Sequence, residues 1–298
     1  MIKDLPNFLK EQEIEYAEQL DVSAVSYIRI GGKAAYAAMP NSTEKLVNLV
    51  NYLYDAGISY RLAGGMTNIL PSDSDYHGVL IITTKCGGYS LAEDRLKLEC
   101  GVRLTSFIRE AAHFGFCGME SLFGIPGTVG GMVYSNAGAY GSSVADLFIS
   151  AMIYSPSDKK IFTLDACDMG FSYRHSALMG TDNILLCADF AAQKDVTEKI
   201  LSRINAVMQK RRKAQPYDMP SIGSVFKRCG DTPISLLIDR MGLKGLRVGG
   251  AEISKKHAGF IVNAGGATER NYLELVSTVK DRIYKEYGII PEEEIERF

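Results

Sequence analysis

The chain has 298 residues, of which 46% are hydrophobic and 23% are charged, a composition typical of a folded globular protein rather than a disordered or fibrous one. Its net charge of −2 argues against nucleic acid as the main ligand, because nucleic-acid-binding domains are usually basic. Charged side chains throughout Met1–Leu20 exclude a signal peptide. We therefore expect a cytoplasmic protein with reduced cysteines, and the cysteine and histidine spacing predicts no metal site.

The predicted elements alternate between helix and strand along the chain. Hydrophobic periodicity and turn residues predict, in chain order, a helix over 7–20, a strand and turn over 27–32, a strand over 33–39, a helix over 43–56, strands over 59–63, 79–83 and 96–100, a helix over 104–114, strands over 147–154 and 184–190, helices over 195–213 and 232–241, a strand over 259–263 and a helix over 270–287. This order lacks the regularity of a doubly wound sheet, so the predicted fold class is α+β. A shift in composition suggests a domain boundary near residue 193.

Glycine is the one unusual residue, at 29 of 298 positions, or about 10% where ~7% is usual. Two loops concentrate the signal: a first glycine loop (Gly64–Asn68) and a second glycine loop (Gly124–Gly141). Consecutive N–H groups in such turns bind anions, and the missing Cβ atoms let the backbone approach a pyrophosphate. Neither loop is a Walker A motif, and the chain has no G-x-G-x-x-G. On residue type alone, plain turns and a phosphate-binding pair of loops both remain open.

The second glycine loop carries a more specific pattern. Gly124-Ile-Pro-Gly-Thr-Val-Gly-Gly131, followed by Asn136-Ala-Gly-Ala-Tyr-Gly141, resembles the signature of the UDP-N-acetylenolpyruvoylglucosamine reductase (MurB) family. Five further segments occur in the order of that family: Arg29–Gly32, Gly64–Asn68, Tyr173–Ser176, Gly223–Phe226 and Lys256–Asn263. The similarity extends from about Ser26 to Glu294 and resembles the shorter type II form of the family.

The resemblance implies an FAD-binding fold of the vanillyl-alcohol-oxidase (PCMH) type, with two subdomains at residues 1–90 and 91–193 and a PCMH-type region over about 26–193. An α+β substrate-binding domain would follow at 194–298, with its C-terminal segment returning to the active site. FAD would be bound non-covalently by residues of both glycine loops: Gly64, Gly65, Met66, Thr67, Asn68, Gly127, Thr128, Gly130, Gly131 and Gly138. Met66 stands where the family usually has glycine, so a positive φ there would be strained.

The resemblance also implies a reaction, the NADPH-dependent reduction of UDP-N-acetylglucosamine enolpyruvate to UDP-N-acetylmuramate in peptidoglycan precursor synthesis. Hydride addition to the enolpyruvyl group builds negative charge on its carboxylate, so a nearby cation and a neutral acid would stabilise the transition state. Arg174 matches the family's carboxylate-binding arginine, Ser224 its proton-donor serine, and Glu294 its catalytic glutamate, for which we expect a raised pKa.

Residue type alone leaves a structural alternative for each of these three. A serine after glycine is commonly a turn residue, an arginine after an aromatic residue is commonly exposed, and the acidic segment Pro291–Phe298 is typical of a solvated surface. The assignment of the glutamate also depends on the alignment register, because three neighbours are candidates: Glu292, Glu293 and Glu296.

Three further residues are candidates for substrate binding. Lys213 closes the basic run Lys210–Lys213 and stands beside Ala214, where the family often has a lysine; it could contact the UDP diphosphate or simply favour the helix dipole. Tyr140 and Asn263 could line the site or serve in packing. The expected partners are the enolpyruvyl nucleotide and NADPH, with no nucleic acid, no membrane insertion and a monomeric state. Two alternatives remain open: another oxidase or dehydrogenase of the same flavin fold, and a non-catalytic nucleotide-binding protein.

Overall fold

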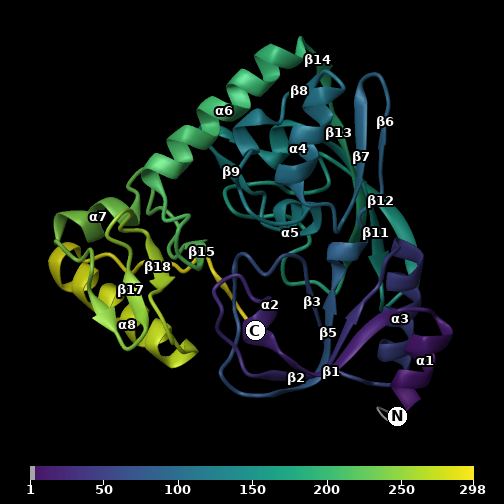
Figure 1. Cartoon of the computed structure of the whole chain (residues 1–298), viewed down its shortest axis with the longest axis horizontal. Helices are drawn as coiled ribbons and strands as arrows, with labels where there is room; N and C mark the ends of the chain where they lie inside the picture. The colour runs from purple at the N-terminus through teal and green to yellow at the C-terminus, as the bar shows by residue number, and fades with distance from the viewer. Residues whose placement is uncertain (1–3) are drawn as a thin grey trace. The chain divides into compact units, whose positions relative to one another are not determined.

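The computed structural model describes residues 4–298, whose helices and strands fall into two units. Unit 1 comprises Met1–Glu18, Tyr36–Gly65 and His77–Gln209, and unit 2 comprises Gln19–Ala35, Met66–Tyr76 and Lys210–Phe298. Each unit has its own hydrophobic core, and Figure 1 traces the chain through both. The mixture of helices and strands confirms the predicted α+β class. The division into 1–90, 91–193 and 194–298 stays a prediction, and its first three residues lie outside the described part of the chain.

A four-stranded sheet with the order β1-β2-β5-β3 starts the fold. Its strands are β1 (Glu15–Asp21), β2 (Lys33–Met39), β3 (Tyr60–Ala63) and β5 (Tyr76–Ile82), and β3 pairs with β5 in parallel. In unit 1, α1 (Leu5–Glu11) contacts α3 (Thr43–Asp55), where the ring of Phe8 stacks on that of Tyr52 with centroids 4.1 Å apart. The apolar face of α3 is buried in the core of the unit, as its periodicity predicts.

The second sheet of unit 1 is antiparallel and has the order β12-β11-β13-β7-β6. Its strands are β6 (Tyr89–Leu91), β7 (Arg95–Glu99), β11 (Phe148–Ser155), β12 (Lys160–Asp165) and β13 (Ile184–Ala191). Two helices follow β7 in the chain, α4 (Leu104–His113) and α5 (Val129–Tyr134), and α5 packs against β7 and β13. The smaller elements are the pairs β8 (Phe116–Cys117) with β14 (Gln193–Lys194) and β9 (Gly138–Ala139) with β10 (Ser142–Ser143), and the 3-10 turns η2 (Thr83–Lys85), η3 (Glu120–Leu122) and η4 (Val144–Asp146).

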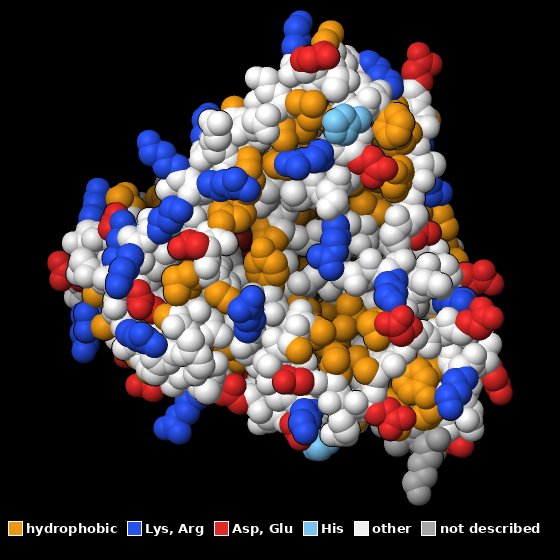
Figure 2. Space-filling view, in the orientation of Figure 1, with side chains coloured by type: hydrophobic (Ala, Val, Ile, Leu, Met, Phe, Trp, Pro, Cys, Tyr) orange, Lys and Arg blue, Asp and Glu red, His pale blue; other side chains and the backbone are white. Residues whose placement is uncertain are grey.

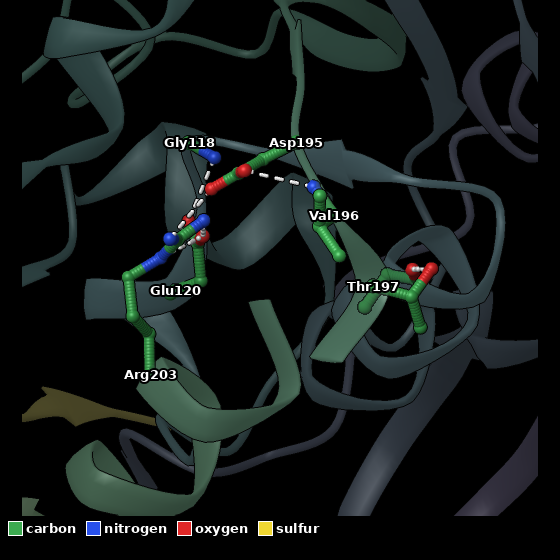
Figure 3. Close-up of polar contacts among 7 residues, drawn as sticks. Gly118, Glu120, Asp195, Val196, Thr197 and Arg203 are labelled. Atoms are coloured by element: carbon green, nitrogen blue, oxygen red, sulfur yellow. Dashed lines mark hydrogen bonds and ion pairs between the residues drawn. The ribbon is translucent and has the colours of Figure 1, made fainter. Parts of the chain in front are cut away.

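A polar cluster fixes the first turns of α6 (Thr197–Ala214) to the rest of unit 1 (Figure 3). Arg203 of α6 donates from Nε to Glu120 Oε1 at 2.9 Å and pairs through Nη1 with Asp195 Oδ2 at 2.7 Å. Glu120 also accepts a bond of 2.7 Å from the backbone N–H of Gly118. The hydrogen bond from Arg203 lowers the pKa of Asp195. The cluster therefore orients the helix through charge-assisted hydrogen bonds, which are stronger than neutral ones.

Unit 2 is built on a four-stranded antiparallel sheet with the order β15-β18-β17-β16. The strands are β15 (Ser221–Ser224), β16 (Arg247–Val248), β17 (Ala251–Ile253) and β18 (Phe260–Asn263). The helices α7 (Ile234–Arg240) and α8 (Glu269–Tyr287) belong to this unit (Figure 1), and α8 packs against β16 and β17. The remaining elements of the unit are α2 (Val22–Val25), β4 (Ile69–Leu70) and β19 (Glu296–Arg297).

The segment that contains β4 is also tied to the start of α8 in unit 2. The Asp73 carboxylate accepts the backbone N–H of Glu269 at 2.8 Å, and the Glu269 carboxylate in turn accepts the hydroxyl of Ser72 at 2.9 Å. A carboxylate at the first turn satisfies N–H groups that have no partner within the helix. This exchange holds the segment after the first glycine loop on a rigid helix.

Two of the sequence predictions are wrong. The helix predicted over 7–20 ends at Glu11, because Glu13 adopts a φ of 50° and Ile14 N–H bonds back to the Leu9 carbonyl at 2.8 Å; a strand, β1, follows. Residues 27–32 form no strand, since Arg29 and Gly31 have φ values of 58° and 141°, which a strand does not allow. The predictions for β2 and α3 are confirmed, with the Ser42 hydroxyl capping α3.

The surface charges in Figure 2 are mixed in sign, and the described helices are not of the kind that crosses a membrane. On the face drawn in Figure 2, lysine and arginine side chains are interspersed with aspartates and glutamates. Within residues 4–298, every helix is too short or too polar to cross a bilayer. The second glycine loop includes one short helix, α5, and the short strand β9.

Candidate functional site

The second glycine loop holds a buried hydroxyl with no protein partner in the described part of the chain. Thr128 is the N-cap residue of α5, yet its side chain makes no capping bond, and its Oγ1 has no hydrogen-bond partner among residues 4–298. Only 1% of Thr128 is exposed. A Cβ atom added to Gly64 would lie 2.2 Å from this Oγ1, so only glycine fits there. Leaving a buried hydroxyl unpaired costs about 1–3 kcal/mol, which indicates that a ligand acceptor, such as a phosphate oxygen, belongs beside Thr128.

At other positions of this loop, glycine is required for different structural reasons. The Gly130 N–H donates to the Cys100 carbonyl at 2.8 Å, and a Cβ atom at Gly130 would lie 3.2 Å from that oxygen. A Cβ atom at Gly138 would lie 2.6 Å from the Ser142 carbonyl oxygen in the β9–β10 hairpin. Gly127 has a φ of 141°, which strongly favours glycine. A Cβ atom added to Gly131 would lie 3.9 Å from Thr128 Oγ1, which is an ordinary contact distance. The amide of Gly130 is therefore used by the protein itself.

Arg174 and Gly138, both predicted site residues, are in direct contact in unit 1. The Arg174 Nη2 donates to the Gly138 carbonyl at 3.3 Å, and its guanidinium carbon lies 5.2 Å from the ring centroid of Tyr173. Arg174 has a φ of 55° and is half-buried. Tyr140, in the same hairpin as Gly138, is 53% exposed and has a φ of 55°. The structure thus presents a cation and an aromatic ring from neighbouring loops of one unit.

The first glycine loop spans the division between the units, with Gly64 and Gly65 in unit 1 and Met66, Thr67 and Asn68 in unit 2. Met66 adopts the positive φ that the sequence analysis considers, 50°, and is 3% exposed. A left-handed conformation costs a residue with a Cβ about 1–2 kcal/mol, so this loop is strained where glycine is absent.

In unit 2, hydrogen bonds join two predicted site residues, Asn68 and Glu294, and connect them to the residue that follows a third, Ser224. The Asn68 Nδ2 donates to the backbone carbonyl of Glu294 at 3.0 Å, and the Glu294 N–H donates to the carbonyl of Val225 at 2.8 Å, directly after Ser224. Gly223, before Ser224, has a φ of 84°. The segment after Glu294 continues as β19, which pairs in parallel with β4. Residues distant in sequence are thereby brought to one place in the fold.

The two glutamates just before Glu294 form ion pairs with lysine or arginine side chains. Glu293 accepts hydrogen bonds from Lys280 and Arg297; burial raises the pKa of its carboxyl, but these two cations outweigh burial and the pKa is lowered. Glu292 pairs with Lys227 at 2.6 Å and is exposed. Because a charged, paired carboxylate cannot act as a neutral acid, these contacts argue against Glu293 in that role. The raised pKa expected for Glu294 stays a prediction.

Asn263 is 9% exposed and makes four hydrogen bonds with the backbone of unit 2. Its Nδ2 donates to the carbonyls of Ile28 and Arg29 at 3.0 and 3.2 Å, and its Oδ1 accepts from the N–H groups of Gly265 and Ala267 at 3.0 and 3.1 Å. These contacts use both N–H groups and both lone pairs of the amide. They support the packing alternative for Asn263, in which it holds residues 26–32 against the end of β18.

Lys213 is exposed on the last turn of α6, whereas Arg211, in the same basic run, is only 3% exposed. This buried cation is not among the site residues predicted from the motifs. Its signal is the helical spacing, because Arg211 follows Ile204 and Val207 at intervals of seven and four residues, along the apolar stripe of α6.

Comparisons with known proteins bear on this geometry. One family model, "UDP-N-acetylenolpyruvoylglucosamine reductase, C-terminal domain", matches residues 215–298, and a second, "FAD binding domain", matches residues 34–161. A UDP-N-acetylenolpyruvoylglucosamine reductase from Caldicellulosiruptor saccharolyticus is 39% identical over 290 residues, covering 97% of this chain and 93% of the relative. The chain belongs to the UDP-N-acetylenolpyruvoylglucosamine reductase family.

Two other members of the family extend the comparison. The reductase from Lactobacillus helveticus is 36% identical over 281 residues, covering 94% of each chain. The crystal structure of the reductase (MurB) from Thermus caldophilus superposes with a TM-score of 0.81 at 30% identity, covering 96% of this chain and 98% of that one. The family predicted from the six motifs is confirmed, as is the FAD-binding fold with a C-terminal domain.

Proposed function

We propose that this chain reduces the enolpyruvyl group of UDP-N-acetylglucosamine enolpyruvate to UDP-N-acetylmuramate, with NADPH as reductant and FAD as cofactor, in peptidoglycan precursor synthesis. The observation that carries the proposal is the identity of 39% over nearly the whole chain to a reductase of that name, together with the match to an FAD-binding domain. When bound, FAD supplies the hydride transfer between NADPH and the carbon–carbon double bond. The remaining chemistry falls to the side chains of this chain.

The buried Thr128 hydroxyl supports the assignment of FAD binding to the two glycine loops. Its orphaned Oγ1 fits a phosphate oxygen, and the missing Cβ atom of Gly64 lets the Thr128 side chain pack against the first glycine loop. We assign the cofactor contacts to the residues predicted from the motifs: Gly64, Gly65, Met66, Thr67, Asn68, Gly127, Thr128, Gly131 and Gly138, with Gly130 acting through its lack of a side chain.

Arg174 is the proposed partner of the enolpyruvyl carboxylate. A guanidinium can bind a carboxylate through two parallel hydrogen bonds, and its charge stabilises the dianionic character that develops during reduction. Its Nη2 donates to the carbonyl of Gly138, a proposed cofactor contact, which supports a place for the guanidinium near the cofactor loop. Its half-buried position strengthens the interaction relative to an exposed arginine.

Ser224 is the proposed proton donor to the reduced carbon, and Glu294 the proposed neutral acid beside the substrate carboxylate. A serine hydroxyl is a weak acid, so it needs a strongly basic intermediate or a relay to give up its proton. The backbone contact from Glu294 to Val225 supports a common placement of the two residues in unit 2. Gly223, with its positive φ, allows the irregularity of strand β15 just before Ser224.

Further assignments complete the proposal. Tyr140 and Lys213 are proposed to contact the nucleotide, and Asn263 to support the site by holding the 26–32 segment. The FAD-binding part is proposed to divide near residue 90 and to end near residue 193, and the substrate-binding part to follow. We also propose that the protein acts in the cytoplasm as a monomer.

A spectroscopic titration tests the function. The purified protein should be yellow, NADPH should bleach its flavin absorbance, and UDP-N-acetylglucosamine enolpyruvate should restore it under anaerobic conditions with formation of UDP-N-acetylmuramate. A flavin-loaded sample that the nucleotide never reoxidises would contradict the proposal. Rapid reoxidation by oxygen alone would favour an oxidase with another substrate, and a colourless protein that binds UDP-sugars would favour a non-catalytic role.

A further inference from the structure

Arg174 lies at the tip of a two-residue turn in unit 1. The backbone N–H groups of Ser172 and His175 each donate to the carbonyl of the other at 3.2 Å, which leaves Tyr173 and Arg174 as the two central residues. Arg174 has a φ of 55°, a left-handed conformation that a residue with a Cβ keeps only where its surroundings impose it. The position of the guanidinium therefore depends on whatever holds this turn.

Asn136 holds the first end of the turn. Its Nδ2 donates to the Ser172 carbonyl at 2.8 Å, while its Oδ1 accepts from the N–H of Ala145 at 3.0 Å. Only 6% of Asn136 is exposed. The side-chain oxygen of Asn136 therefore fixes its own loop, and the side-chain nitrogen holds the turn that contains Arg174.

Two further contacts join the same segments. The Ser176 hydroxyl, fully buried just after the turn, donates to the Tyr134 carbonyl at 2.6 Å. The Arg174 Nη2 donates to the Gly138 carbonyl at 3.3 Å. Residues 134–138 therefore bind the turn at both ends and also bind the guanidinium. Because Gly138 is a proposed cofactor contact, this short segment connects the proposed cofactor-binding loop to Arg174, the arginine proposed to bind the substrate.

We infer that Asn136 is a positioning residue for Arg174 in the reaction, acting through its hydrogen bond to the Ser172 carbonyl. The inference rests on the proposed function, in which Arg174 binds the enolpyruvyl carboxylate. A bidentate guanidinium–carboxylate pair depends closely on geometry, and the loss of the Asn136 donor lets the turn relax from its left-handed conformation. Asn136 itself touches neither the nucleotide nor the cofactor in this scheme.

The test uses two variants and one matched control on the flavin-loaded protein. Asn136→Asp keeps the acceptor for Ala145 and the size of the side chain but removes the donor to Ser172, and Asn136→Ala removes both. Ser135→Ala is the control, because it deletes a neighbouring side-chain bond of 3.1 Å to the Gly131 carbonyl that does not reach the turn. Anaerobic stopped-flow absorbance follows flavin reduction by NADPH and reoxidation by UDP-N-acetylglucosamine enolpyruvate separately.

We expect both Asn136 variants to lower the limiting rate of reoxidation by about 10- to 100-fold, with the rate of reduction by NADPH and the flavin content unchanged. Ser135→Ala should match the wild type in both half-reactions. In an Arg174→Ala background, replacing Asn136 should cause no further loss, since the residue that it positions is gone. A crystal structure of Asn136→Asp should show Arg174 with a negative φ.

Several results would overturn the inference. Equal slowing of both half-reactions would indicate a general structural role, and so would full additivity with Arg174→Ala. If the wild type is not reoxidised by the nucleotide, the proposed function itself is wrong, and if Arg174→Ala is as fast as the wild type, the role of Arg174 is wrong. If those two hold and the Asn136 variants react at the wild-type rate, only the positioning role fails. Asn136→Asp carries the measurement if Asn136→Ala loses its flavin.

Discussion

The side-chain amide of Asn68 donates a hydrogen bond of 3.0 Å to the backbone carbonyl of Glu294, so that a residue of the first glycine loop holds the proposed acid in place. The contact is reinforced by a bond of 2.9 Å from the Glu296 N–H to the Asn68 carbonyl, which begins the pairing of β19 with β4. Within unit 2, the backbone that the motifs assign to the cofactor therefore also fixes the backbone of Glu294.

Removal of Glu296–Phe298 should slow flavin reoxidation by the enolpyruvyl nucleotide about tenfold or more, while NADPH still reduces the flavin. The deletion removes the bonds from the Glu296 N–H to Asn68 and from the Phe298 N–H to Leu70. Glu294 then keeps only its own backbone bonds to Asn68 and Val225, without the β19–β4 pairing that supports them. Stopped-flow absorbance measures both steps. Glu296→Ala is the control, because its exposed side chain is lost but its backbone bond remains. A deletion that reoxidises as fast as the control would contradict the anchoring role.

Replacing Thr128 with valine should have opposite effects on the apoprotein and on cofactor binding. Valine has the shape of threonine but no hydroxyl, so the flavin-free protein should gain about 1 kcal/mol in its free energy of unfolding, because a buried, unpaired polar atom is removed. The dissociation constant for FAD should rise about tenfold, equivalent to ~1.4 kcal/mol. Urea unfolding and flavin fluorescence measure the two quantities, with Thr128→Ser as the control that keeps the hydroxyl. Unchanged FAD affinity in the valine variant would mean that the hydroxyl does not face the cofactor.

Two replacements of Met66 separate backbone strain from side-chain burial. Both Met66→Ala and Met66→Gly lose a buried side chain, which costs roughly 2–5 kcal/mol at core positions. Only alanine keeps the strain of a φ near 50°, so the glycine variant should be more stable than the alanine variant by about 1 kcal/mol. Urea denaturation of both variants under the same conditions gives the difference. Equal stability, or a more stable alanine variant, would show that the left-handed conformation is not maintained in solution.

His257 should make the stability of the protein depend on pH just below neutrality. Burial, with a smaller contribution from Lys244, lowers the pKa of His257 from its usual 6.5, and its Nδ1 accepts the Gly259 N–H at 3.1 Å in the neutral form. Below pH 6.5 the unfolded chain takes up a proton that the folded chain resists, so the free energy of unfolding should fall as the pH drops from 6.5 towards the lowered pKa.

The replacement His257→Asn tests this dependence, because the amide oxygen of asparagine can accept the Gly259 N–H and does not titrate. Urea denaturation at a series of pH values should give a smaller slope for this variant than for the wild type across that window. His77→Asn, at an exposed position, is the control and should retain the wild-type slope. Identical slopes in the wild type and His257→Asn would refute the prediction.

The elements that the sequence predicts correctly are those that local pattern decides. Leu46, Leu49, Val50 and Leu53 recur at helical spacing and are all buried in α3. The failed helix over 7–20 has a similar run of polar and apolar residues, but the positive φ of Glu13 and the recruitment of Glu15–Asp21 into a sheet override the local preference. The family and the FAD-binding fold were predictable because six motifs occur in one order.

The contacts within the candidate site could not be predicted in the same way. Asn68 and Glu294 are 226 residues apart in sequence, and nothing in either local segment indicates their hydrogen bond. The role of Asn136 depends on the Ser172–His175 turn, which only the folded chain brings beside it. Asn263 shows the reverse case, since a polar residue in a family motif proves to satisfy four backbone groups of the protein itself.

The composition of unit 2 from three separate segments limits how this protein can be cut into fragments. Residues 19–35 and 66–76 contribute Ile28, Ile30 and Leu70 to the core that Lys210–Phe298 completes. A fragment ending at Gln209 would keep these three side chains but lack the partners that cover them, and exposed apolar clusters of this kind promote aggregation. A fragment beginning at Lys210 would lack strand β4, to which its own β19 pairs. Isolated halves should therefore be insoluble or unfolded when made separately, and recover their structure only when both are present during folding.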